Sequence, residues 1–78
     1  MPRFFFDVHD DIDVIDDVGI ELPDLDAARA EAARTLADVA SELLPDNGMR
    51  KTLAINVRGE SGQMVLKTSL RYVAELQP

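Results

Sequence analysis

The chain contains no cysteine and no tryptophan, and it has one histidine, four prolines and four glycines among 78 residues. Without cysteine it can form no disulfide, no thiolate metal site and no cysteine nucleophile. No stretch approaches the ~18 consecutive apolar residues that a membrane-spanning helix needs. The N-terminal apolar run ends at Asp7 after three phenylalanines, whereas a signal peptide needs roughly 7–15 apolar residues. We therefore expect a cytoplasmic protein without membrane contact.

Hydrophobic residues make up 46% of the chain, which is typical of a globular protein, and we expect residues 1–78 to form a single domain. The net charge is −7 and is unevenly distributed, because residues 1–47 hold 13 acids and 3 bases while residues 48–78 hold 2 acids and 5 bases. Bulk acidity disfavours nonspecific DNA binding. A local basic patch in the C-terminal part remains open.

The clearest element is an amphipathic helix predicted over residues 24–44. Asp24 is a good N-cap after Pro23, because its carboxylate can accept the free amides of the first turn. Pro45 and the turn at 46–48 should end the helix. Its apolar residues recur at spacings of three and four, which is the helical period: Leu25, Ala28, Ala32, Leu36, Val39 and Leu43. These residues predict one face packed on a sheet.

Alternating apolar residues predict four strands, over residues 3–8, 12–16, 51–58 and 63–73, with a hairpin turn at Gly59–Gly62. The element order is then ββαββ. Pairing the third strand with the first gives a fully antiparallel sheet of order 2-1-3-4 with the helix on one face. This α+β arrangement places the strand that holds Phe4, Phe5 and Phe6 in the centre, as its two partly apolar faces require.

Four short segments carry a family resemblance: Pro2-Arg3-Phe4-Phe5-Phe6, Asp17-Val18-Gly19, Glu21-Leu22-Pro23-Asp24 and Ala28-Arg29-Ala30-Glu31-Ala32. With these segments, most of the chain resembles a family of small uncharacterised proteins, common in α-proteobacteria, that is catalogued as a domain of unknown function. Val18 stands where such proteins often have a charged residue. The resemblance implies no activity, because none is attached to the family.

The acidic segment 7–17 holds six aspartates and His9. Several carboxylates could bind a divalent cation, but the EF-hand pattern counted from Asp11 fails, since Ile15 stands where a carboxylate is needed and Asp16 where a glycine is needed. We expect a solvated turn whose charge protects a strand edge. His9 lacks a nearby nucleophile in the sequence, and we expect it to be exposed. No catalytic residue, metal site or cofactor is predicted.

Arg29 interrupts the apolar stripe of the helix, about 40° from Leu25 when viewed along the axis. We expect its stem to pack on the sheet and its guanidinium to form an ion pair with Asp17 or Glu21. The alternative is an anchor for a bound anion.

The strand registers place Arg58, Lys67 and Arg71, together with Arg3, on the sheet face opposite the helix. Basic residues beside Phe5 could contact RNA or another anion, although the chain's acidity makes nucleic acid the weaker expectation. The last strand would be an exposed edge. We therefore expect a non-enzymatic binding or regulatory module with a protein partner, which could be a second copy bound through this edge or the open sheet face. RNA or anion binding by the basic face is the alternative.

Overall fold

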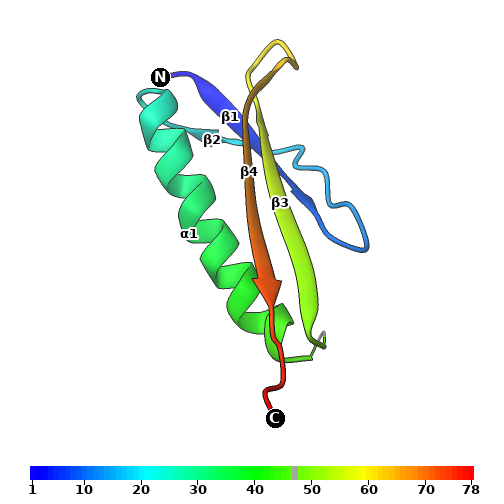
Figure 1. Ribbon diagram of the computed structural model, residues 1–78. Helices are drawn as coiled ribbons and strands as arrows, with labels where there is room; N and C mark the ends of the chain where they lie inside the picture. Colours follow the sequence, from blue (N-terminus) through cyan, green and yellow to red (C-terminus); the bar gives the residue numbers. More distant parts are fainter. Residues whose placement is uncertain (47) are drawn as a thin grey trace.

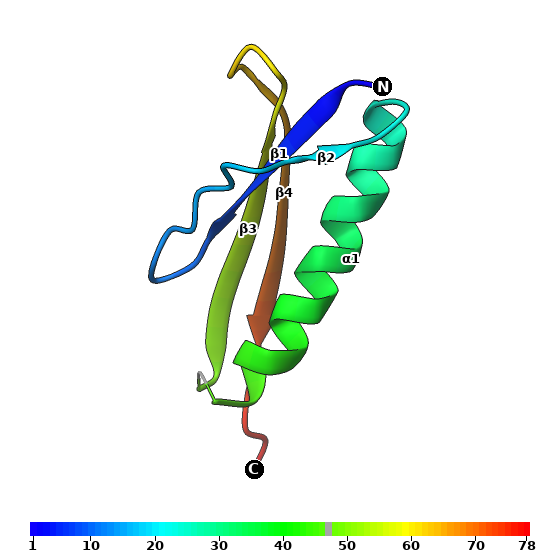
Figure 2. The same ribbon diagram turned by 180° about the vertical axis from the view of Figure 1, so that it is seen from behind.

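The computed structural model describes residues 1–46 and 48–78. One long helix lies across one face of a four-stranded antiparallel sheet of order β2-β1-β3-β4, as predicted (Figure 1). The same view from behind shows the helix on one side only (Figure 2). The elements in chain order are β1 (Arg3–His9), β2 (Ile20–Glu21), α1 (Leu25–Leu43), the short 3₁₀ helix η1 (Leu44–Asp46), β3 (Arg50–Arg58) and β4 (Met64–Val73).

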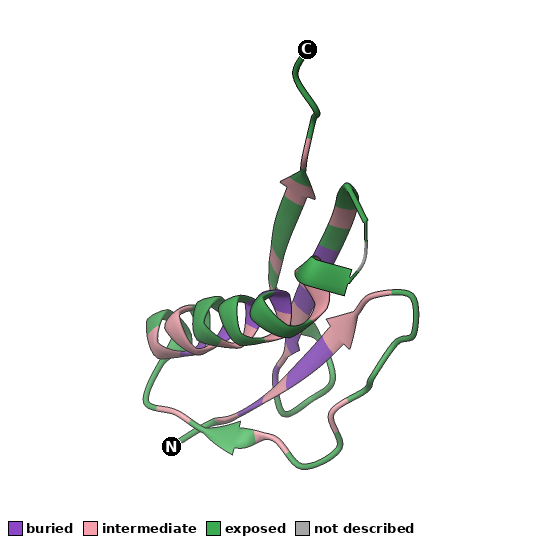
Figure 3. Cartoon of the chain, turned by 90° about the horizontal axis from the view of Figure 1, so that it is seen from below, coloured by how far each residue is buried: buried purple, intermediate pink, exposed green. Residues whose placement is uncertain are grey.

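The core lies between α1 and the two central strands, β1 and β3. Strand alternation turns Phe4 and Phe6 toward the helix, and the register that pairs Phe6 with Val57 sets the β3 side chains on the same face. Leu53, Ile55 and Val57 are at most 1% exposed. In Figure 3 the buried positions gather where the strands face the helix, while the outer side of the helix is exposed. The apolar phenylalanine strand is central, as predicted.

Helix α1 begins as the sequence predicts. The Asp24 carboxylate accepts a hydrogen bond of 2.8 Å from the Ala27 amide, which satisfies one of the free donors of the first turn. The buried stripe differs in detail from the prediction, because it consists of Ala28, Ala32, Leu36 and Ala40, while Leu25 is 47% exposed. Three of these four side chains are alanines, so the helix backbone can lie close to the sheet.

The second strand was predicted at residues 12–16, and this prediction is wrong. That segment contributes one isolated bridge, in which Val14 and Val8 exchange backbone hydrogen bonds of 2.9 Å. The strand beside β1 is β2 at Ile20–Glu21, where Glu21 pairs with Arg3. Alternation at 12–16 predicts a strand with one buried face, but Ile12, Val14 and Ile15 are all more than half exposed. The segment follows β1 as an irregular loop.

Both chain reversals around β3 fall close to the predicted positions. Helix α1 continues into η1 before β3, and the predicted turn at 46–48 includes Asn47, which lies outside the described residues. The hairpin between β3 and β4 closes with hydrogen bonds from the Gly59 amide to the Gln63 carbonyl and from the Gly62 amide to the Gly59 carbonyl. A bulge at Val57/Arg58 shifts the register near this turn. Among the described residues no helix is long and apolar enough to cross a membrane.

Candidate functional site

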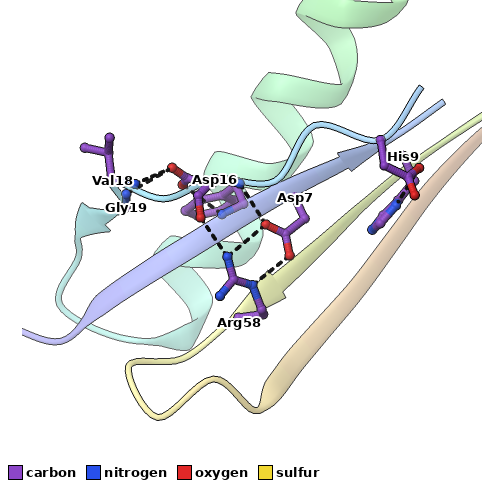
Figure 4. Close-up of polar contacts among 8 residues, drawn as sticks. Asp7, His9, Asp16, Val18, Gly19 and Arg58 are labelled. Carbon is purple, nitrogen blue, oxygen red and sulfur yellow. Dashed lines mark hydrogen bonds and ion pairs between the residues drawn. The ribbon is translucent and has the colours of Figure 1, made fainter. Parts of the chain in front are cut away.

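The open sheet face carries a partly buried ion pair between Asp7 of β1 and Arg58 of β3 (Figure 4). Arg58 Nε donates to Asp7 Oδ2 at 2.7 Å, and its terminal nitrogen donates to Asp7 Oδ1 at 3.0 Å. A further bond of 2.7 Å joins the guanidinium to the backbone carbonyl of Asp16, and the guanidinium carbon lies 5.1 Å from the centre of the Phe5 ring. Arg58 therefore ties two strands to the loop beside them.

Asp16 takes the place of a strand partner along the outer edge of β1. One carboxylate oxygen accepts the Phe6 amide at 3.0 Å, and the other accepts the amides of Val18 and Gly19 at 3.0 and 3.1 Å. The Asp16 amide in turn donates to Asp7 Oδ1 at 3.0 Å. A carboxylate thus satisfies an edge amide of β1 that an unbroken strand would otherwise have bonded.

The electrostatics of this cluster favour its ionised form. The bidentate contact with Arg58 is the main cause that lowers the pKa of Asp7, against the opposing effect of burial. For Asp16, desolvation acts to raise the pKa, but the three backbone amides and the charge of Arg58 together outweigh it, so the pKa is lowered. Asp7 in turn raises the pKa of Arg58. Each group keeps its partner charged. Asp7, Arg58 and Asp16 therefore form a structural clamp on the open sheet face.

Two further contacts neutralise parts of the acidic segment. Lys51 forms ion pairs with Asp10 and, at 3.0 Å, with Asp11, and its own side chain is only 10% exposed. These contacts lower the pKa of Asp10 and raise that of Lys51. His9, predicted to be exposed, is half-buried and lies 3.0 Å from the Asp13 carboxylate. Among residues 1–46 and 48–78 no three carboxylate or imidazole groups gather closely enough to hold a metal ion.

Of the four cations predicted on the basic face, two have ionic partners and two have none among the described residues. Arg3 forms an ion pair of 3.1 Å with Glu21 and donates to the carbonyls of Val18 and Gly19, while Arg58 is held by Asp7. Lys67 and Arg71 are exposed on β4, where they pair across the ladder with Asn56 and Thr52. Half of the predicted set is therefore unavailable to a ligand unless an existing ion pair is broken.

Arg29 is placed differently from the prediction. Its Nε contacts Asp26 at 3.1 Å one turn earlier in the helix, and its side chain is 58% exposed. The predicted partner Glu21 is bound to Arg3, and Asp17 is exposed. The physical reason is that the buried stripe is centred on Ala28, Ala32 and Leu36, which turns Arg29 toward solvent. The contact is an ordinary surface pair.

The two edges of the sheet differ in how they are closed. The edge beyond β1 is covered by the two-residue strand β2, the Val8–Val14 bridge and the Asp16 carboxylate. The edge at β4 is a strand of ten residues without proline or glycine. Among the described strands it pairs on one side only, with β3. Leu70 and Val73 are 37% and 42% exposed along it.

The hydrogen-bond pattern shows which β4 groups point outward. The Ala74 amide donates to the Met49 carbonyl at 2.7 Å, and the register continues from Arg50 paired with Val73 to Val57 paired with Leu66. Since bonded and non-bonded pairs alternate in an antiparallel ladder, the even-numbered residues bond to β3. The amides and carbonyls that face away from the sheet belong to Lys67, Ser69, Arg71 and Val73.

A shallow apolar groove of about 370 Å³ adjoins this edge, between the C-terminal half of α1 and β4. Its lining includes Ala37, Ser41 and Leu44 of the helical side and Tyr72 of β4. A second groove, of about 420 Å³, lies on the other side of α1 against the loop that holds Ile12 and Val14. The first groove is the one that adjoins β4, because Tyr72 of that strand lines it.

Sequence reasoning did not identify the Asp7–Arg58–Asp16 cluster, because Arg58 is separated from Asp7 by 51 residues and from Asp16 by 42. The predicted pairing of the first and third strands did contain a signal for this cluster. Asp7 faces the open side of β1, and its direct partner is Asn56, two residues from Arg58 on the same face. A charged residue among phenylalanines at that position indicates an opposite charge on the neighbouring strand.

Comparison with curated proteins and with solved structures gave no match. The family model described as a domain of unknown function (DUF6894) matches residues 3–71. This span includes α1 and all of the sheet except the last two residues of β4. The chain therefore belongs to the DUF6894 family.

Proposed function

We propose that this protein is a non-enzymatic interaction module that binds a protein partner by adding a strand to the free edge of β4. The observation that carries the proposal is the contrast between the two sheet edges: one is covered by a pinned loop, and the other presents a long, regular row of backbone groups. Unpaired edges of this kind are templates for strand addition.

Side chains along β4 support the same role. Leu70 and Tyr72 face the helix side beside the apolar groove, while Lys67 and Arg71 face the open side. A bound strand would gain affinity from main-chain hydrogen bonds and specificity from alternate side chains. An extended partner would therefore meet an apolar surface on one face and two cations on the other.

The basic-face alternative is less well supported. Arg3 and Arg58, half of the cations it requires, are already bound to Glu21 and Asp7. RNA-binding sheets present aromatic rings for base stacking, whereas the Phe5 ring lies against the Arg58 guanidinium. Of the four predicted cations, Lys67 and Arg71 have no ionic partner among the described residues and are available for an anionic ligand on this face.

The test compares the wild-type protein with Ser69→Pro on an array of varied ten-residue peptides. The Ser69 amide points outward, so proline removes a donor that the β3–β4 ladder does not use. Ser69→Ala is the matched control, because it keeps the amide. The proposal predicts that a subset of peptides binds the wild type and Ser69→Ala and that this binding is lost in Ser69→Pro. Equal binding to all three variants would overturn it, as would no binding together with a monomeric wild-type protein.

A further inference from the structure

We infer that the partner strand is β4 of a second copy, and that the two copies pair about a two-fold axis through Leu70. This inference rests on the proposed function, because it uses the same edge. Pairing of the two β4 strands joins the two four-stranded sheets into one continuous sheet with both α1 helices on the same face. A two-fold axis perpendicular to a sheet keeps the helices on one side.

The backbone limits the registers that can form. The outward groups are regular from Lys67 to Val73, and the bulge, which places Val65 between the residues paired with Val57 and Arg58, ends this regular stretch. An axis at Leu70 pairs Lys67 with Val73 and Ser69 with Arg71 of the second copy, which uses every outward residue of the regular stretch. About eight main-chain hydrogen bonds result, since each bonded pair exchanges two. An axis at Thr68 would instead pair Arg71 with Val65 of the second copy, which lies in the bulge.

Charge disfavours the neighbouring register with its axis at Ser69. An axis at Ser69 would place Lys67 directly opposite Arg71 of the second copy, and like charges directly opposite each other destabilise a ladder. The axis at Leu70 places Ser69 opposite Arg71 instead. It also brings together the two Leu70 side chains, each 37% exposed in the single chain. The same register thus avoids the repulsion and covers exposed apolar surface.

The flank of α1 beside β4 suits the approach of a second helix. Ala33, Ala37 and Ser41 recur every fourth residue on this flank, are all exposed, and carry no charge. Helix α1 contacts both β3 and β4, so pairing at the β4 edge places the two helices beside each other on the same face of the joined sheet. Helices pack at 8–10 Å. Small side chains on the facing flanks would allow an approach of this kind.

The exposed area is also consistent with an uncovered interface. The chain exposes 5308 Å², whereas a compact monomer of 8.6 kDa is expected to expose about 4,700 Å². The C-terminal tail beyond β4 accounts for part of this excess, since Figure 1 shows it leaving the body of the molecule. A standard interface covers about 800 Å² on each partner, and the β4 edge, the groove and the helix flank are the surfaces that the second copy would cover.

Single cysteines test the register, because the natural chain has none. Residues that face each other in a non-bonded pair have Cα atoms about 4.5 Å apart, within the range of a disulfide. Leu70→Cys should therefore cross-link to its copy under mild oxidation. In the same register Ser69→Cys and Thr68→Cys would lie about 8 and 14 Å from their copies, beyond the reach of a disulfide.

The expected result is a covalent dimer from Leu70→Cys that forms at least about tenfold faster than from Ser69→Cys or Thr68→Cys. Light scattering of the wild type should give twice 8.6 kDa at high concentration and one chain mass for Ser69→Pro. Fastest cross-linking of Thr68→Cys or Ser69→Cys would overturn the register. If the wild type is monomeric but binds array peptides, and Ser69→Pro abolishes this binding, the inference that the partner is a second copy is wrong. The proposed function would then still hold.

Discussion

Replacing Asp7 with asparagine tests whether the clamp on the open face stabilises the fold. Asparagine keeps the shape of the side chain but removes the charge. It also replaces one of the two carboxylate oxygens that accept hydrogen bonds from Arg58 with an amide nitrogen, which cannot accept them. The two affected hydrogen bonds are 2.7 and 3.0 Å long. The Asp16 amide, which donates to Asp7 Oδ1 at 3.0 Å, depends on the same group.

The size of the effect follows from burial. The Asp7 side chain is 8% exposed and that of Arg58 is 28% exposed. Hydrogen bonds to charged groups contribute roughly 1.5–3 kcal/mol each, but water can reach part of the Arg58 guanidinium and recover some of the loss. We expect Asp7→Asn to lower the free energy of unfolding by about 2 kcal/mol. For a domain of this length, that corresponds to a fall of roughly 8–16 °C in Tm.

Thermal unfolding followed by circular dichroism measures this difference, with Asp26→Asn as the matched control. Asp26 also pairs with an arginine, but the two side chains are 81% and 58% exposed, so its loss should change Tm little. If Asp7→Asn and Asp26→Asn unfold at the same temperature, the clamp does not stabilise the fold and the reasoning from burial is refuted.

Four further outcomes are expected. The pKa values of Asp7 and Asp16 are lowered from 3.8, so the two carboxylates stabilise the fold above that pH and lose this effect as the pH falls through their native pKa values. Urea unfolding should therefore show that the free energy of unfolding falls below about pH 4, and a flat profile in that range would contradict the lowered pKa values. Gly19→Ala should lower Tm by destabilising the fold by at least about 1 kcal/mol, since Gly19 has φ +77° and an added Cβ would lie 2.8 Å from Arg3 Cγ. Ala32→Leu should destabilise by about 1–3 kcal/mol in urea unfolding because Ala32 is 0% exposed; tolerance would mean that the helix can move away from the sheet. Arg29→Ala should change stability by less than about 0.5 kcal/mol in the same assay, and a larger loss would restore the buried role expected from the sequence.

Much of the fold could be predicted because its strongest patterns are local. The helix has a capping aspartate, small residues at helical spacing and a terminating proline, and each of these acts within a few residues. Strands β3 and β4 alternate clearly and are joined by a short glycine-containing turn. The sheet order then followed from the requirement that the phenylalanine strand have neighbours on both sides.

The segment between β1 and α1 could not be predicted in the same way. Its alternating valine and isoleucine residues resemble a strand, but Ile12, Val14 and Ile15 are all more than half exposed. The path of this loop is set by Asp16, whose carboxylate accepts amides from both β1 and the loop itself. Hydrogen bonds from a side chain to a backbone ten residues away leave no periodic pattern.

The errors about charged residues have a related cause. Arg29 was assigned to the buried face because a helical wheel centred on Leu25 placed it there, whereas tertiary packing selected the stripe through Ala28, Ala32 and Leu36. Arg3 and Arg58 were predicted on the correct strands, but their ionic partners come from residues distant in the chain. For these strand residues the face could be predicted from the sequence, whereas the charge that each one meets could not.

The free edge of β4 is tested most directly by amide hydrogen exchange at low and high protein concentration. At low concentration the amides of Leu66, Thr68, Leu70 and Tyr72 should be protected by bonds to β3, while those of Lys67, Ser69, Arg71 and Val73 exchange rapidly. At high concentration the second set should become protected as well. Rapid exchange of the second set at every concentration would contradict pairing of this edge with another copy.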